Sequence, residues 1–318
     1  MQTTGESVSR LWAITSYFNP AGYRRKLQNY RVFRQRLNVP LVAVELSQSG
    51  LFELRPEDAD ILVQLRGGDV MWQKERLLNI AIMHLPNECA YVAWLDCDIV
   101  FQREDWGAAA VRELDRAGIC HLFHTVHHVR RDTPHEAIGC ETSNLRHESI
   151  GYACASGIRT SVAAVTDGVP GVFKRGHGWC ARRELLEEHG LYDRNVLGSG
   201  DKLIAFAATG QEEEVIARDS MAPGHAADYR EWASKFGRSV QRIGYIEGDI
   251  FHLWHGDLER RQYTARYRVL GSAGYDPASD IALDAEKCWR WNSPKPDMHR
   301  KVREYFEQRD EDGERRAG

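Results

Sequence analysis

Several kinds of sequence feature are missing, and each absence narrows the class of protein. The longest apolar runs fall far short of the ~20 residues that a membrane-spanning helix needs. The first ten residues, MQTTGESVSR, lack the apolar stretch of a secretory signal peptide. The seven cysteines show no Cys-x-x-Cys spacing, and their odd number favours reduced thiols over a disulfide framework. We therefore expect a cytoplasmic protein without a membrane span.

A large excess of charge of one sign is missing too. Lys and Arg total 42 against 46 Asp and Glu, and the formal net charge is −4. The chain as a whole therefore has no general attraction to nucleic acid. With 42% hydrophobic and 28% charged residues among 318, the composition is that of a soluble chain able to bury a sizeable core. Internal repeats and low-complexity segments are also lacking.

Strand-like and helix-like segments alternate over the first 130 residues. Apolar runs predict strands, and apolar residues at helical spacing predict the helices between them. The predicted strands are 10–18, 40–46, 91–101 and 119–128, and the predicted helices are 22–37, 72–85 and 104–118. This alternation predicts parallel strands with right-handed crossovers in a doubly wound sheet.

Beyond residue 130 the pattern loosens. Residues 130–151 are polar and predict a loop. Further on, helices are predicted at 179–190, starting within 198–210 and at 299–309, with a strand at 243–254.

The strand predicted at 91–101, YVAWLDCDIVF, contains two acids one residue apart, Asp96 and Asp98. Carboxylates are rarely buried unless they are paired or bind a metal. Ligands of open α/β sheets bind beyond the carboxyl ends of the strands. Mn²⁺ or Mg²⁺ commonly binds carboxylates together with phosphate oxygens. The pair therefore favours a metal-bound diphosphate, and the alternative is two acids that cap a turn.

Histidines form the second feature. His252 and His255 stand three residues apart, and a glycine and the arginines Arg260 and Arg261 follow them. Imidazole is a ligand for Mn²⁺-type ions, and Arg suits diphosphate oxygens, although structural histidines are the alternative. The histidine-rich stretch at 119–128 lacks tetrahedral zinc spacing, so we expect structural histidines there, some of them lining a cleft.

Together these motifs resemble those of GT-A-fold glycosyltransferases over most of residues 10–270. In that superfamily an Asp-x-Asp at a strand end binds the divalent ion on the diphosphate of a nucleotide sugar. The helix KERLLNIAI resembles the Arg-x-x-Asn helix that precedes this strand, here with Arg76 and Asn79. A histidine after the last core strand is often a further metal ligand, which points to His252 or His255. The resemblance thus implies Asp96, Asp98, His252 and His255 as the metal set.

Residues 176–210 resemble the acceptor segment of the same superfamily. An acidic motif that usually ends in Glu-Asp reads Gly200-Asp201 here. The resemblance implies Asp201 as catalytic base of an inverting enzyme, or as a residue that orients the acceptor in a retaining one. Gly200 and Trp179 complete the predicted acceptor set, although a structural tryptophan is equally compatible with the sequence.

Donor contacts are predicted at the end of the first strand, where Thr15 and Ser16 carry hydroxyls and Tyr17 carries a ring that can stack on a base. The alternative is that the aromatic belongs to the core. Arg66 precedes two glycines that allow close backbone approach to phosphates, unless they simply mark a loop. The full predicted donor set is Thr15, Ser16, Tyr17, Arg66, Arg76, Asn79, Asp96 and Arg260.

The expected fold class is α/β: a single GT-A-like, doubly wound mixed sheet flanked by helices. The catalytic domain is expected over 1–270, with a nucleotide-sugar half at 10–130 and an acceptor half at 131–270. A C-terminal helical extension with a charged tail is expected over 271–318.

The expected activity is metal-dependent hexosyl or pentosyl transfer from a nucleotide sugar, with a UDP-sugar favoured and Mn²⁺ or Mg²⁺ as cofactor. The acceptor stays open among a glycan, a small molecule and a modified nucleic-acid base. The alternatives are a nucleotidyltransferase and a catalytically silent module that binds nucleotide sugars.

Overall fold

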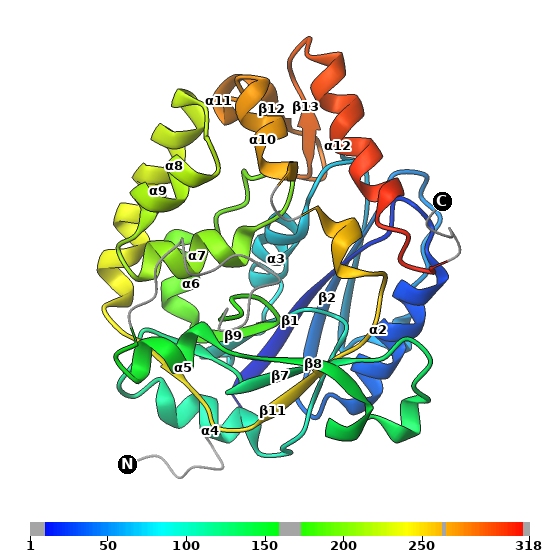
Figure 1. Cartoon of the computed structure of the whole chain (residues 1–318), viewed down its shortest axis with the longest axis vertical. Coiled ribbons are helices and arrows are strands. Elements are labelled where there is room, and N and C mark those ends of the chain that lie inside the picture. The colour runs from blue at the N-terminus through cyan, green and yellow to red at the C-terminus, as the bar shows by residue number, and fades with distance from the viewer. Residues whose placement is uncertain (1–9, 159–172, 263–264, 314–318) are drawn as a thin grey trace.

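A seven-stranded mixed sheet runs through the middle of the molecule (Figure 1). The computed structural model describes residues 10–158, 173–262 and 265–313. The strand order is β10-β6-β9-β4-β1-β2-β3, with β9 antiparallel to both of its neighbours. The strands are β1 (Leu11–Phe18), β2 (Leu41–Ser47), β3 (Ile61–Arg66), β4 (Tyr91–Leu95), β6 (Ile119–His121), β9 (Gly178–Arg182) and β10 (Ile243–Tyr245). The chain is therefore an α/β protein built on a mixed sheet, as the sequence predicts.

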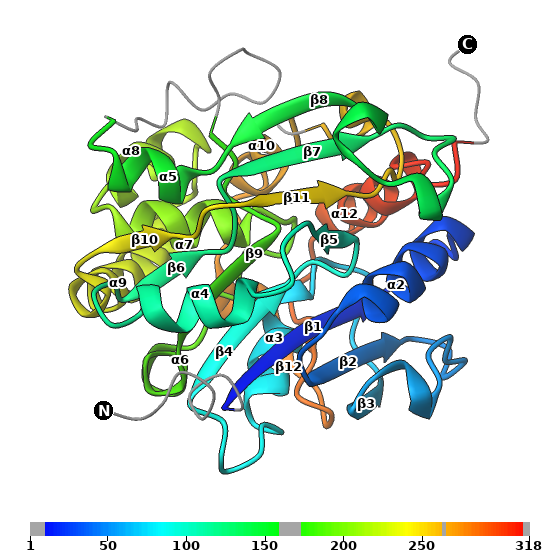
Figure 2. The ribbon, with the colours of Figure 1, turned by 90° about the horizontal axis from the view of Figure 1, so that it is seen from below.

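A smaller sheet lies at one side of the large one (Figure 2). It contains four strands in the order β5-β11-β7-β8. Their bounds are β5 (Ile99–Phe101), β7 (Thr125–Val129), β8 (Ser143–Glu148) and β11 (Asp249–His252).

Three predicted strands each break in the middle and pass from the large sheet into the small one. Residues 91–101 form β4 and β5, residues 119–128 form β6 and most of β7, and residues 243–254 form β10 and β11. Each apolar run thus contains two strands, which the sequence pattern does not separate. The first break is Asp96-Cys97-Asp98, so the two acids lie in the crossing between the sheets and not within a strand.

Helices cover both faces of the large sheet, and their apolar sides form two cores. Alternate residues of β1 divide between these cores: Ala13 faces α2 and α4, whereas Ile14 faces α3, α7 and α9. Strands buried on both faces read as continuous apolar runs, which explains why they are visible in the sequence. The flanking helices are α2 (Arg24–Arg36), α3 (Lys74–Ile82), α4 (Trp106–Glu113), α7 (Gly200–Ala208) and α9 (Pro223–Val240).

Two predictions for the middle of the chain are wrong. Residues 179–182 of the helix predicted at 179–190 belong to strand β9, because the buried Trp179, Cys180 and Ala181 pair with β4 and β6. Only the following residues form a helix, α6 (Arg183–His189). The loop predicted at 130–151 contains β8 and the 3₁₀ turns η2 (His135–Ala137) and η3 (Cys140–Thr142). Three helices of this region have no counterpart among the predicted elements: the short α5 (Ile150–Ala155) and α8 (Glu212–Arg218), and the long α9 (Pro223–Val240).

The C-terminal part packs against the rest through a third core. Its elements are η4 (Leu258–Arg261), α10 (Ala265–Ser272), α11 (Pro277–Asp280), β12 (Ile281–Leu283), β13 (Trp289–Trp291) and α12 (Pro296–Gln308). Tyr275, Met298 and Phe306 belong to a buried cluster that also contains Met71 and Val196. The predicted helical extension therefore also holds a β-hairpin. Residues 1–9, and 314–318 of the charged tail, lie outside the described residues.

In the described part of the chain, every helix is too short or too polar to cross a lipid bilayer.

The helices α7 and α9 pack closely at Gly237, where an added Cβ would lie 2.4 Å from the carbonyl oxygen of Ala207. Replacing Gly by Ala within a helix normally stabilises it by about 1 kcal/mol. At this position we expect the opposite, a loss of about 1–3 kcal/mol from overpacking. Urea unfolding of Gly237→Ala, compared with the exposed neighbour Arg238→Ala, measures the effect. A Gly237→Ala protein more stable than the parent would contradict the close packing.

Candidate functional site

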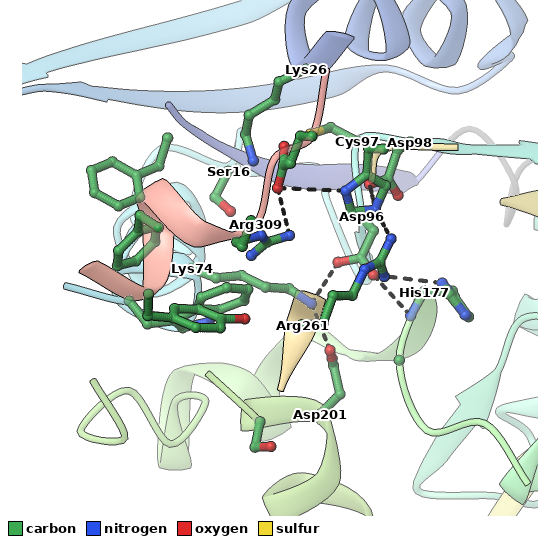
Figure 3. A pocket seen from close by; sticks show the side chains of 18 of the residues that line it. Ser16, Lys26, Lys74, Asp96, Cys97, Asp98, His177, Asp201, Arg261 and Arg309 are labelled. Atoms are coloured by element: carbon green, nitrogen blue, oxygen red, sulfur yellow. Dashed lines mark hydrogen bonds and ion pairs between the residues drawn. The ribbon is translucent and has the colours of Figure 1, made fainter. Parts of the chain in front are cut away.

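The carboxyl ends of β1 and β4 open into a cavity of about 240 Å³ (Figure 3). Segments far apart in the sequence form its walls. Its acidic residues are Asp96, Asp98, Asp201 and Glu311, and its basic residues are Lys26, Lys74, Lys174, Arg175, Lys202, Arg218, Arg261, Arg266 and Arg309. Basic side chains outnumber acidic ones in a chain whose net charge is negative. The cavity therefore suits an anionic ligand.

Lys74 lies between two of these acids (Figure 3). Its Nζ is 2.6 Å from Asp96 Oδ1 and 2.7 Å from Asp201 Oδ2. Lys74 is the first residue of α3, Asp96 follows β4, and Asp201 lies in the first turn of α7. Burial lowers the pKa of Lys74, but the charges of Asp201 and Asp96 outweigh it and hold this pKa well above its usual range. The lysine is thus a permanent cation that joins the starts of two helices to the end of a strand.

The second oxygen of Asp96 is also engaged. Asp96 Oδ2 accepts a hydrogen bond of 3.1 Å from the backbone N–H of His177, and the N–H of Asp96 donates to the carbonyl of His177. Burial raises the pKa of Asp96, Lys74 opposes this rise, and the nearby Asp201 and Asp98 add to it. The two carboxylate oxygens of Asp96 are therefore in contact with Lys74 and with His177.

Asp98, His252 and His255 form a separate cluster on the other side of Asp96. His255 Nε2 lies 3.0 Å from Asp98 Oδ2, and His252 Nε2 lies 3.8 Å from Asp98 Oδ1. The two Nε2 atoms are 3.1 Å apart. Each of the three residues offers one ligand atom within 4.8 Å of the others. Among the described residues, the buried Asp98 Oδ1 has no hydrogen-bond partner.

These three side chains fit a divalent cation by charge as well as by distance. Burial raises the pKa of Asp98, but the charge and hydrogen bond of His255 and the charges of His177 and Arg261 lower it to about 2. Burial holds the pKa of His252 well below its usual range, so its imidazole is neutral and can offer a lone pair to a metal. The cluster thus combines one carboxylate with two imidazoles, a donor set that suits Mn²⁺.

Further side chains hold the cluster in place. His128 Nδ1 lies 3.1 Å from His252 Nδ1, the ring nitrogen remote from Asp98. Arg261 Nη2 lies 2.9 Å from His255 Nε2, the same nitrogen that contacts Asp98. Glu311 Oε1 is 3.5 Å from His255 Nδ1. A ligating histidine is normally oriented by a contact to its other ring nitrogen.

Of the predicted site residues, six line the cavity. They are Ser16, Asp96, Asp98, Asp201, His252 and His255. Among the four predicted metal ligands, the structure brings Asp98 together with both histidines and places Asp96 on Lys74 instead.

Three predicted contact residues lie in the core, outside the residues that line the cavity, which corrects their assignment. Thr15 is fully buried and donates to the carbonyl of Leu95 at 2.8 Å, so it links two strands. Tyr17 is buried on the α2 side, and its hydroxyl donates to Glu53. Trp179, in the central β9, stacks on His121 with 3.9 Å between ring centroids. Side chains of buried strands alternate between the faces, so neighbours of a site residue need not reach the site.

The predicted motif residues Arg76 and Asn79 also have structural partners. Arg76 pairs with Asp193 at 3.1 Å, and Asn79 hydrogen-bonds Asp193 and both the N–H and the carbonyl of Leu191. They fasten α3 to the segment that leads into α7, and so position Asp201 indirectly. Neither side chain lines the cavity.

Arg66, Arg260 and Gly200 lie outside the cavity lining as well. The side chain of Arg66 packs against Gly50, and Arg260 lies 3.7 Å from Asp310. Arg261, the next residue, lines the cavity in place of Arg260. Gly200 has no room for a side chain, because an added Cβ would lie 2.0 Å from Glu75 Oε1.

Sequence reasoning misses Lys74, His177, Arg309 and Glu311. Lys74 precedes Arg76 in the motif helix, and that proximity is its only signal. Arg309 is the last residue of the helix predicted at 299–309 and Glu311 belongs to the charged tail, and neither position signals a site. Their contribution depends on tertiary folding.

No known family model matches the chain, and no curated protein matches it. Solved structures do match, at low identity. The S. aureus TarS fragment 1–349 in complex with UDP is 12% identical to this chain, with a TM-score of 0.41. The match covers 84% of this chain and 66% of the TarS fragment, so this chain spans slightly under two thirds of that fragment's length.

Two other matches are more distant. A Drosophila β1,4-galactosyltransferase 7 mutant with manganese, UDP-Gal and xylobiose is 12% identical, with a TM-score of 0.31, over 64% of this chain and 62% of that one. The 4-diphosphocytidyl-2C-methyl-D-erythritol synthase of Anaerococcus prevotii is 11% identical, with a TM-score of 0.36, over 77% and 90% of the two chains. At these identities and TM-scores the matches assign no function to this chain.

Replacing Lys74 by Met leaves Asp96 and Asp201 as neighbouring buried carboxylates without the cation between them. Breaking such a bridge costs up to about 3–5 kcal/mol. The folded-state pKa of Asp96, already raised, would rise further, so the loss of stability should be largest at neutral pH and should shrink as the pH falls toward 5. Urea unfolding at both pH values measures this. The exposed Lys235→Met is the control, and an equal loss at both pH values would contradict the carboxylate bridge.

Proposed function

We propose that this chain is a glycosyltransferase that moves a sugar from a nucleotide-sugar donor to an acceptor hydroxyl with the help of a divalent metal. The observation that carries the proposal is the arrangement of one cavity. The cation-binding cluster of Asp98, His252 and His255 lies on one side of Asp96, and Lys74 with Asp201 lies on the other. Basic side chains surround both.

The donor diphosphate is assigned to the side of the cavity with the cation cluster. A divalent ion held by Asp98, His252 and His255 would stabilise negative charge on the departing diphosphate. Two imidazoles with one carboxylate favour Mn²⁺ over Mg²⁺, which prefers oxygen ligands. Arg261 lies 2.9 Å from His255 and is placed to share the charge of the phosphates.

An aromatic wall is the proposed contact for the donor's base or sugar. Phe18, Trp72 and Phe306 line the cavity. The ring centroid of Phe306 lies 5.6 Å from that of Phe18 and 6.3 Å from that of Trp72. Aromatic faces bind flat base and sugar surfaces well. This wall takes the role that the sequence assigns to Tyr17. A UDP-sugar stays the favoured donor.

Asp201 is the proposed general base. In the reaction, the acceptor oxygen bonds to the anomeric carbon, its proton passes to a carboxylate oxygen of Asp201, and the bond from that carbon to the diphosphate oxygen breaks with its electrons. Lys74 holds the Asp201 carboxylate at a fixed place in the cavity. A base held in a fixed position can accept the proton without first having to be oriented. The division into donor and acceptor halves and the cytoplasmic location stay predictions.

A donor screen tests the function. UDP-, GDP-, CMP- and dTDP-sugars are incubated with the protein and Mn²⁺, and free nucleotide diphosphate is measured with and without a panel of hydroxyl acceptors. We expect Mn²⁺-dependent release from one nucleotide class. For Asp98→Asn we expect loss of turnover and at least ~100-fold weaker Mn²⁺ binding by calorimetry. Asp115→Asn, a change of an exposed acid, is the control.

Other outcomes of the screen would overturn the proposal. Pyrophosphate release from a nucleoside triphosphate and a sugar phosphate would identify a nucleotidyltransferase. Tight nucleotide-sugar binding without turnover across the acceptor panel would identify a binding module. Unchanged Mn²⁺ affinity in Asp98→Asn would remove the metal assignment.

The base role of Asp201 predicts a separation of binding from chemistry. Asp201→Asn preserves the shape of the side chain and removes its ability to accept the proton. We expect transfer to slow by ~10²–10⁴-fold, with donor affinity changed by much less. Steady-state kinetics and donor titration measure the two quantities. If donor affinity falls as steeply as the transfer rate, Asp201 supports binding and another group is the base.

A further inference from the structure

A second group of possible metal ligands lies outside the cavity, on the small sheet. His127 Nε2 is 2.9 Å from Asp249 Oδ2, and Cys140 Sγ is 3.8 Å from His127 Nε2 and 4.0 Å from Asp249 Oδ2. His127 is buried, Asp249 is partly exposed and Cys140 is exposed. None of the three lines the cavity that contains Lys74 and Asp98. Three different ligand types thus meet at one edge of the surface.

The pleat of the small sheet separates this group from the first cluster. β7 pairs in parallel with β11, and the register places His128 opposite His252 and His127 opposite Phe251. His128 and His252 point to the Asp98 cluster, where their Nδ1 atoms are in contact. Successive side chains of a strand point to opposite faces. His127 therefore points away from the first cluster, to the same face as Phe251. Asp249 is two residues before Phe251 on β11, so its side chain points to that face as well.

The 3₁₀ turn η3 brings the sulfur to this face. Cys140 is the first residue of η3, which leads into β8, the antiparallel neighbour of β7. Ser143 Oγ donates to the carbonyl of Cys140 at 2.9 Å and lies 3.4 Å from His127 Nδ1. A proton on Nδ1 directed at Ser143 leaves Nε2, the atom nearest to the sulfur and the carboxylate, available as a ligand. Contacts to the remote ring nitrogen orient metal-bound histidines in this way.

We propose that His127, Cys140 and Asp249 bind a zinc ion that fastens the segment before β8 to the small sheet. Tetrahedral bond lengths of about 2.3 Å to sulfur and 2.0 Å to nitrogen or oxygen put ligand atoms about 3.3–3.6 Å apart. The observed separations of 2.9, 3.8 and 4.0 Å bracket this range, so shifts of less than an ångström complete the geometry.

The ligand types select the metal. Thiolate, imidazole and carboxylate together suit Zn²⁺ and its substitute Co²⁺, whereas Mg²⁺ requires oxygen ligands and Mn²⁺ binds thiolate less well. The first cluster has no sulfur, so the two groups differ in metal preference. With Cys140 exposed, the fourth position is open to a water molecule. This zinc site does not depend on the proposed glycosyl transfer, because its test measures only metal binding and stability.

Cobalt binding by the whole chain tests the site. The protein is stripped with a chelator and titrated with Co²⁺ and, separately, with Zn²⁺. We expect a thiolate-to-cobalt charge-transfer band in the near ultraviolet, and a rise in melting temperature on adding Zn²⁺. Cys140→Ser should abolish the band and weaken Zn²⁺ binding by more than the ~10–100-fold that loss of an outer-shell contact costs. Asp249→Asn should weaken Zn²⁺ binding as well.

Two variants serve as matched controls. Cys154→Ser replaces a partly buried thiol elsewhere and should keep the band and the Zn²⁺ affinity. Asp98→Asn alters the first cluster and should also keep the band. A Co²⁺ spectrum without a thiolate band, or unchanged Zn²⁺ stoichiometry and affinity in Cys140→Ser, would overturn the site. His127 and Asp249 would then be a hydrogen-bonded pair beside an exposed cysteine.

Discussion

A single ammonium group between two carboxylates sets the geometry of the cavity. Lys74 links the end of β4 to the start of α7 through Asp96 and Asp201. Two carboxylates at this distance from one cation would otherwise repel each other in a partly buried space. The neighbouring Glu75 is adapted to the same crowding. Burial raises the pKa of Glu75 to about 8, with the charge of Lys74 opposing this rise and the charge of Asp201 adding to it. Glu75 therefore carries less negative charge near neutral pH than an exposed glutamate does.

The crossing of three apolar runs from one sheet to the other places the remaining parts. The first crossing carries Asp96 and Asp98, and the strand after the third crossing ends at His252. β5 and β11 pair antiparallel, with Ile99 opposite His252, and the N–H of Leu253 donates to the carbonyl of Asp98 at 2.8 Å. Residues more than 150 positions apart are thereby held within hydrogen-bonding distance by backbone pairing. This pairing fixes the strand ends next to Asp98 and at His252, whereas His255 lies three residues beyond β11.

The sequence predicts the parts of this architecture that depend on local pattern. β1, β2, α2 and α3 are visible because buried strands are continuously apolar and surface helices are periodic. The acid pair and the histidines are recognisable because their chemistry is unusual where an apolar run ends.

Other parts depend on which way a side chain points after folding. Trp179 and Tyr17 stand near site residues in the sequence but face the core. Arg76 and Asn79 belong to a recognisable motif, yet they hold the segment at Leu191 and Asp193. Lys74 and Glu311 reach the cavity only because distant segments pack together, for which periodicity gives no signal.

The segment after α12 forms part of the cavity wall although it is far from the sheet in sequence. Arg309 and Glu311 pair at 2.6 Å and line the cavity, and the carboxylate of Asp312 accepts hydrogen bonds from the first backbone N–H groups of α2, at Arg24 and Arg25. A protease that trims the chain after Gln308 would therefore remove one side of the binding pocket and uncap a helix, while the central sheet keeps all its strands. An affinity tag attached at this end has to leave the contacts of Arg309, Glu311 and Asp312 intact.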